Sequence, residues 1–99
     1  MKIIYEKRGT GKTTKLIQMS HDMNTYILTV NQKRAALIAK MAQEMDIIIP
    51  YPVTVDDYMR NRFRGSFIKD ILIDDADDVL KQIFHTVNIE AITMTDRNE

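Results

Sequence analysis

Short apolar runs alternate along this chain with longer segments of helical periodicity. Runs rich in β-branched and aromatic residues predict strands, and apolar residues repeated every three or four positions predict helices. The expected strands are residues 2–5, 25–30, an extended stretch within 46–55, 68–75 and 89–95. The expected helices are residues 11–23, 31–45, 54–63 and 76–85.

The clearest of these elements is the helix expected at residues 31–45. Asn31 can cap its first turn, because a short polar side chain accepts a hydrogen bond from a backbone N–H that has no partner inside the helix. Its apolar stripe consists of Ala35, Leu37, Ile38, Met41 and Met45. By contrast, the stretch within 46–55 contains Pro50 and Pro52, which cannot both lie in a central strand.

Five strands alternating with four helices predict an α/β fold with a mostly parallel sheet. Helices would then cover both faces of that sheet, because the crossover connections of parallel strands place them there. No repeat or linker interrupts the pattern, so residues 1–99 are expected to form a single domain.

Composition narrows the functional classes. An apolar fraction of 44% and a charged fraction of 28% are typical of soluble globular domains, and no apolar run is long enough to cross a membrane. The chain has no cysteine and no secretory signal, so a cytoplasmic location is expected. The net charge is zero, and any preference for nucleic acid must therefore come from a local patch.

The first candidate site is the loop "EKRGTGKTT" at residues 6–14, between an expected strand and an expected helix. Gly11, Lys12 and Thr13 fill the last three positions of the phosphate-binding pattern GxxxxGK[ST]. Glu6 stands where that pattern has its first glycine, and it adds a negative charge near the expected phosphates. The alternative is a turn that merely starts a helix.

The second candidate site is the acidic end of the run "ILIDD". A buried parallel strand would deliver Asp74 and Asp75 to the rim of the sheet, where ligands of α/β proteins bind. Asp74 could hold Mg²⁺, and Asp75 could orient or deprotonate an attacking water. Alternatively, Asp75 simply caps the helix that follows.

Together these segments resemble the Walker A loop ("GTGKTT") and the Walker B strand ("ILIDD") of P-loop NTPases. The order of motifs is similar to the first RecA-like lobe of superfamily-one and superfamily-two helicases, and small ATP-binding proteins of bacteriophages are also of this type. The resemblance implies a three-layer sandwich around a five-stranded sheet. It also implies that residues 89–95 form a sensor strand between residues 2–5 and the Walker B strand.

The resemblance further implies ATP and Mg²⁺ as ligands and a role for each matching residue. Lys12 would contact the β- and γ-phosphates, and Thr13 and Asp74 would hold Mg²⁺. Asp75 would take the place of the catalytic glutamate, and Thr93 or Thr95 would sense the γ-phosphate. The loop residues around the phosphates would be Arg8, Gly9, Thr10, Gly11, Lys12, Thr13 and Thr14.

A third candidate is the basic segment "YMRNRFRG", which contains Arg60, Arg62 and Arg64. Arginines interleaved with aromatic residues could contact single-stranded nucleic acid, or could reach the nucleotide of a neighbouring subunit. The simpler interpretation is a solvated basic face that balances the acidic run.

These features favour an ATP-binding, magnesium-dependent P-loop protein with weak or partner-dependent ATPase activity. The resemblance places such a protein in DNA replication, recombination or packaging, with single-stranded DNA, a replication or packaging protein, or further copies of the chain as candidate partners. The competing hypothesis is a degenerate P-loop module that binds or assembles without turnover. Because 99 residues are too few for the second lobe of a helicase motor as well, the chain is not expected to be a motor by itself.

Overall fold

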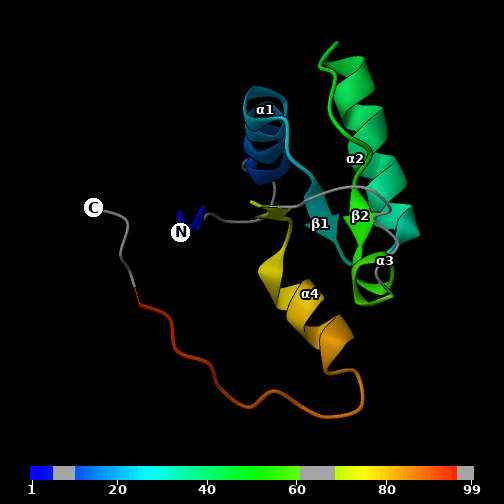
Figure 1. The fold of residues 1–99 in the computed structure, drawn as a ribbon. Helices are drawn as coiled ribbons and strands as arrows, with labels where there is room; N and C mark the ends of the chain where they lie inside the picture. The colour runs from blue at the N-terminus through cyan, green and yellow to red at the C-terminus, as the bar shows by residue number, and fades with distance from the viewer. Residues whose placement is uncertain (6–10, 61–68, 96–99) are drawn as a thin grey trace.

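The computed structural model describes residues 1–5, 11–60 and 69–95, and within these ranges four helices alternate with three strands (Figure 1). The helices are α1 (Lys12–Met23), α2 (Gln32–Glu44), α3 (Val55–Met59) and α4 (Ala76–Ile83). The strands are β1 (Ile27–Thr29), β2 (Val53–Thr54) and β3 (Leu72–Ile73).

The three strands form one parallel sheet in the order β2-β1-β3. Leu28 of β1 lies opposite Val53 of β2 and opposite Ile73 of β3. Because the strands are parallel, their carboxyl ends meet at one edge of the sheet. The segments that follow β1, β2 and β3 therefore start from the same edge.

The five-stranded sheet predicted from the sequence is wrong: the described residues form a sheet of three strands. Residues 2–5 and 89–95 lack regular structure, so the strand expected at residues 89–95 does not lie beside β3. Tyr5, Ile92 and Met94 are exposed, and Figure 1 shows the segment after α4 running away from the helices and the sheet. The three-layer sandwich predicted around five strands is therefore wrong as well.

The four helices, in contrast, lie within the ranges that the pattern predicts, although α3 ends at Met59 and is shorter than the predicted 54–63. Gly11 precedes α1 with φ of 86°, a left-handed conformation that costs glycine little. The Asn31 side chain accepts a hydrogen bond from the backbone N–H of Arg34 at 2.9 Å, as expected for a cap of α2. Thr54 and Asp57 form a capping box at the start of α3, each side chain accepting from the other residue's backbone N–H.

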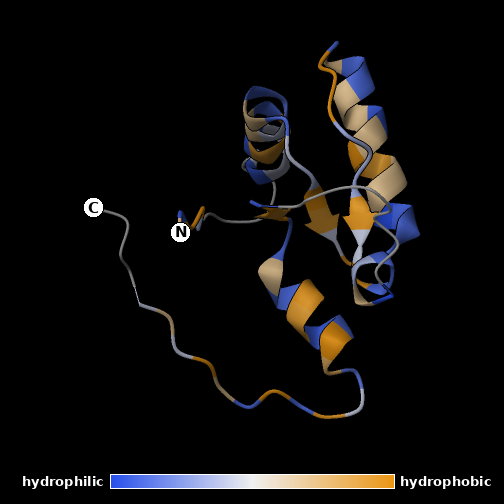
Figure 2. Cartoon of the chain, viewed as in Figure 1, coloured by the Kyte–Doolittle hydropathy of each residue, from blue (hydrophilic) through white to orange (hydrophobic). Residues whose placement is uncertain are grey.

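Two apolar clusters hold the elements together, and β1 contributes to both because its side chains alternate in direction. Ile27 packs with residues of α1, α2 and β3, namely Ile17, Ile38, Ala42 and Leu72. Leu28 packs with residues of β2, α3 and α4, namely Val53, Val55 and Val79. Figure 2 shows the strands in the apolar colour, whereas the helices carry both apolar and polar residues along their length. No described helix has the length and apolar character needed to cross a membrane.

Candidate functional site

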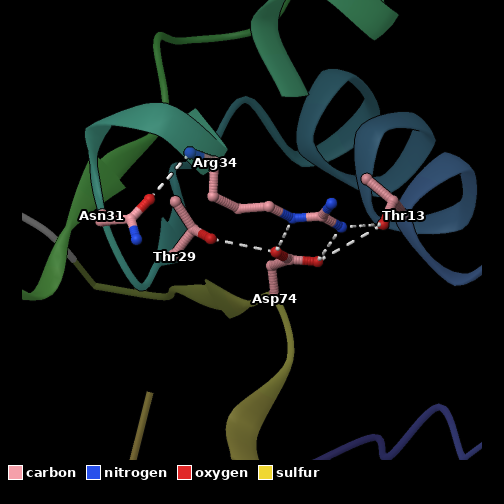
Figure 3. Close-up of polar contacts among 5 residues, drawn as sticks. All are labelled: Thr13, Thr29, Asn31, Arg34 and Asp74. Atoms are coloured by element: carbon pink, nitrogen blue, oxygen red, sulfur yellow. Dashed lines mark hydrogen bonds and ion pairs between the residues drawn. The ribbon is translucent and has the colours of Figure 1, made fainter. Parts of the chain in front are cut away.

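The start of α1 and the end of β3 meet at the edge where the parallel strands end. Thr13, in the first turn of α1, donates a hydrogen bond from Oγ1 to Asp74 Oδ1 at 3.4 Å, across 61 positions of sequence (Figure 3). The sequence predicted these two side chains as partners from their motifs alone. The fold places them together.

Asp74 is the centre of this site. It follows β3 directly, and its side chain is only 5% exposed. Thr29, the last residue of β1, is fully buried and donates from Oγ1 to Asp74 Oδ2 at 3.0 Å. A buried carboxylate needs such donors, because burial removes the water that would otherwise solvate its charge.

Arg34, in the first turn of α2, completes the group. Its Nε donates to Asp74 Oδ2 at 2.9 Å, and its Nη2 donates to Thr13 Oγ1 at 2.8 Å and to Asp74 Oδ1 at 3.4 Å. The hydrogen bond with Asp74 is the main cause that raises the pKa of Arg34 above its ordinary value; burial opposes this, and the charges of Asp74, Asp75 and Asp78 add to it. The guanidinium is therefore charged at every physiological pH.

The first turn of α1 has the charge pattern of an anion site. The N–H groups at the start of a helix lack partners inside the helix and carry a partial positive charge. Acidic residues are the usual complement there, but the first turn of α1 contains none and carries Lys12 and Lys15 instead. Lys12 is half-buried and Thr14 is exposed. A bound phosphate would complement both the helix start and these lysines.

Thr13 and Asp74 fit a magnesium ion in ligand type, since a hydroxyl and a carboxylate are oxygen ligands. The described residues form no group of three or more His, Cys, Asp or Glu side chains that could hold a metal ion. An ion bound here would therefore take the rest of its coordination from phosphate oxygens and water. That division is usual for magnesium in nucleotide sites.

Three further predicted residues, Asp75, Thr93 and Thr95, lie within the described ranges. Asp75 directly precedes α4 with φ of 56° and is exposed, so its carboxylate faces water beside Asp74. Asp75 therefore occupies the N-cap position of α4 without the side-chain hydrogen bond that a capping aspartate would make. Thr93 and Thr95, the expected sensors, are exposed in the segment after α4, outside any strand.

Arg60 lies at the end of α3 and is the only one of the three basic candidates within the described residues. Its Nε donates to Asp56 Oδ1 at 2.9 Å, and both side chains are more than half exposed. The simpler interpretation, a solvated basic face, describes this residue. Other predicted residues lie outside the described ranges, namely Glu6, Arg8, Gly9, Thr10, Arg62 and Arg64.

No family model, curated protein or solved structure in the three comparisons matches this chain. The geometry of Thr13, Thr29, Arg34 and Asp74 is therefore the basis for assigning a function.

Sequence reasoning missed two of these four residues, Thr29 and Arg34. Both carried a usable signal, because each lies at or just after the end of an expected strand. Strand ends of a parallel sheet share one edge, so a polar residue there is a neighbour of Asp74 by topology. The amphipathic pattern of residues 31–45 predicts a helix there but gives Arg34 no further role.

Proposed function

We propose that this chain binds ATP together with Mg²⁺ at the start of α1. Lys12 contacts the phosphates, the backbone N–H groups from Gly11 to Thr14 surround them, and Thr13 and Asp74 hold the ion. Asp75 orients the attacking water in a slow or partner-dependent hydrolysis. The bound ion would neutralise phosphate charge during that step.

The observation that carries this proposal is the contact between Thr13 and Asp74. A hydroxyl at a helix start and a carboxylate at a strand end lie 3.4 Å apart although they come from distant parts of the chain. Turns and helix caps form from neighbouring residues and do not require this juxtaposition. The phosphate-binding pattern and the acidic strand end thus converge on one place.

Equilibrium dialysis with labelled ATP and Mg²⁺ tests the binding step. Replacing Lys12 by Ala is expected to weaken ATP binding about 10- to 100-fold, because it removes a charged hydrogen-bond donor worth about 1.5–3 kcal/mol. Lys40→Ala is the matched control, since Lys40 is an exposed lysine in the middle of α2. Equal ATP affinity for the Lys12 variant and the wild type would contradict the proposed site.

Phosphate release, with and without single-stranded DNA, tests the hydrolysis step. Asp75→Asn is expected to abolish turnover while leaving ATP binding intact, because Asn cannot accept a proton from water. Asn also tolerates the left-handed backbone of this position. Turnover that survives in the Asn variant would remove Asp75 from the proposed mechanism.

A second candidate function is a binding module without turnover, and the position of Arg34 favours it. The guanidinium of Arg34 already neutralises Asp74, so a magnesium ion would obtain less binding free energy from this carboxylate. Such a module would bind ATP in the dialysis experiment and release no phosphate with any nucleic acid.

A further inference from the structure

The position of Arg34 has a consequence for the metal. Magnesium would need a lone pair of Thr13 Oγ1 and an oxygen of Asp74. The hydroxyl of Thr13 already donates to Asp74 Oδ1 and accepts from Arg34 Nη2, and Asp74 accepts from Arg34 through both of its oxygens (Figure 3). The guanidinium thus bonds to both groups that the ion would use.

We propose that Arg34 is an internal counter-ion that closes the magnesium position, so that Mg²⁺ engages Thr13 and Asp74 only when the guanidinium turns out toward solvent. This inference rests on the proposed function, because it concerns the same site. It assigns to Arg34 a role that the phosphate-binding pattern does not contain. Arg34 is then a positioning residue that sets the magnesium concentration at which the site is filled.

Electrostatics make the two cations exclusive. A guanidinium and a divalent ion on the same carboxylate repel each other, and this repulsion is strong because Asp74 is almost fully buried. One cation bound to Asp74 neutralises the carboxylate. A second cation would gain little attraction from Asp74 and would be repelled by the first. Exchange between them is therefore favoured over joint occupancy.

The surroundings of Arg34 permit that exchange. Its side chain is 33% exposed, so the guanidinium borders on water and does not need to cross the core to leave. The charges of Asp75 and Asp78 already act on it. After the exchange, these carboxylates would remain close to the displaced cation. The backbone of Arg34 stays fixed by Asn31, whose side chain holds the first turn of α2.

Thermal unfolding across a Mg²⁺ titration tests the proposal, once without nucleotide and once with millimolar ATP. Arg34→Met keeps the length of the side chain and removes its charge. It is expected to lower the Mg²⁺ concentration for half-maximal stabilisation about tenfold, because the ion no longer has to displace a charged hydrogen-bond donor from Asp74 and Thr13. Lys33→Met, which alters the preceding and exposed lysine of α2, should leave that concentration unchanged. A parallel titration with NaCl at matched ionic strength distinguishes specific Mg²⁺ binding from general screening of surface charges.

Arg34→Lys provides a second variant should the Met variant fail to fold. Lysine keeps the charge but lacks the planar fork that bonds two groups at once, so its half-maximal Mg²⁺ concentration should fall between those of the wild type and the Met variant. Equal Mg²⁺ midpoints in the wild type and all folded Arg34 variants would overturn the proposal. So would the absence of any Mg²⁺ response, with or without ATP.

The Mg²⁺ titrations without nucleotide and with ATP distinguish a failure of this inference from a failure of the proposed function. If ATP stabilises every variant with the same Mg²⁺ midpoint, nucleotide binding stands and the role of Arg34 is wrong. If ATP stabilises none of them but Mg²⁺ alone stabilises the Met variant at a lower concentration than the wild type, Arg34 does compete with the ion and the nucleotide proposal is wrong.

Discussion

Replacing Asp74 by Ala should lower the free energy of unfolding by about 3 kcal/mol, the lower end of the cost of breaking a buried charge pair from one side. The fully buried hydroxyl of Thr29 loses its acceptor, and Arg34 loses its charged partner. The lower end applies because Arg34 is one-third exposed and water can solvate its freed charge. Denaturant unfolding at unchanged slope measures the difference.

Asp75→Asn is the matched control for this experiment. It also removes one carboxylate from the end of β3, but Asp75 is exposed and Asn tolerates its left-handed backbone. The stability of this variant should stay within about 0.5 kcal/mol of the wild type. If the Asp74 and Asp75 variants prove equally stable, the hydrogen bonds around Asp74 do not hold the sheet edge together.

Replacing Ile38 by Ala should lower the free energy of unfolding by about 3 to 4 kcal/mol. Ile38 is fully buried in α2, where it packs against Ile17, Ile27 and Leu72, and its loss leaves a cavity as well as lost apolar burial. This cluster fixes α1 and α2 against the sheet, and so fixes the distance between Thr13 and Asp74. Thermal or denaturant unfolding measures the loss.

The neighbouring Leu37→Ala is the control for that change. Leu37 is 45% exposed on the same helix, and alanine is the better helix former. Its cost should therefore remain below about 1 kcal/mol. Similar costs at the two positions would mean that α2 does not bury the side that faces the sheet.

The helices were predictable from the sequence because their determinants are local. Asn31 caps α2 and Gly11 precedes α1, and these residues act on their own turns. The apolar spacing that predicts residues 31–45 corresponds to α2, in which Ala35, Ile38 and Ala42 are buried, whereas Leu37 of the predicted stripe is 45% exposed. Local signals of this kind do not depend on the rest of the fold.

The extent of the sheet was not predictable because strand pairing depends on distant partners. Residues 27–29 and residues 89–95 are similar apolar and β-branched runs in the sequence. The first is the central strand, while in the second Ile92 and Met94 are about half exposed. The sequence of a short apolar run does not show whether a neighbouring strand has a free edge with which the run can pair.

The candidate site was predictable in part, unlike the helices, which were predictable, and the extent of the sheet, which was not. Thr13 and Asp74 were predicted as partners because their motifs imply a shared ligand. Arg34 was missed, since an arginine on a helix is ordinarily solvated and its partner lies 40 positions away. Only the parallel order of β1 and β3 brings it to Asp74.

Thermal unfolding of the wild type and of Lys12→Ala, with and without ATP and Mg²⁺, is the most direct test of nucleotide binding at the start of α1. Ligand at a hundred times its dissociation constant should stabilise the wild type by about 2.7 kcal/mol. For a domain of this size, that corresponds to an increase in Tm of roughly 10 °C or more. The Lys12 variant should show a clearly smaller increase at the same ATP concentration. An unchanged Tm of the wild type at millimolar ATP and Mg²⁺ would contradict nucleotide binding at this site.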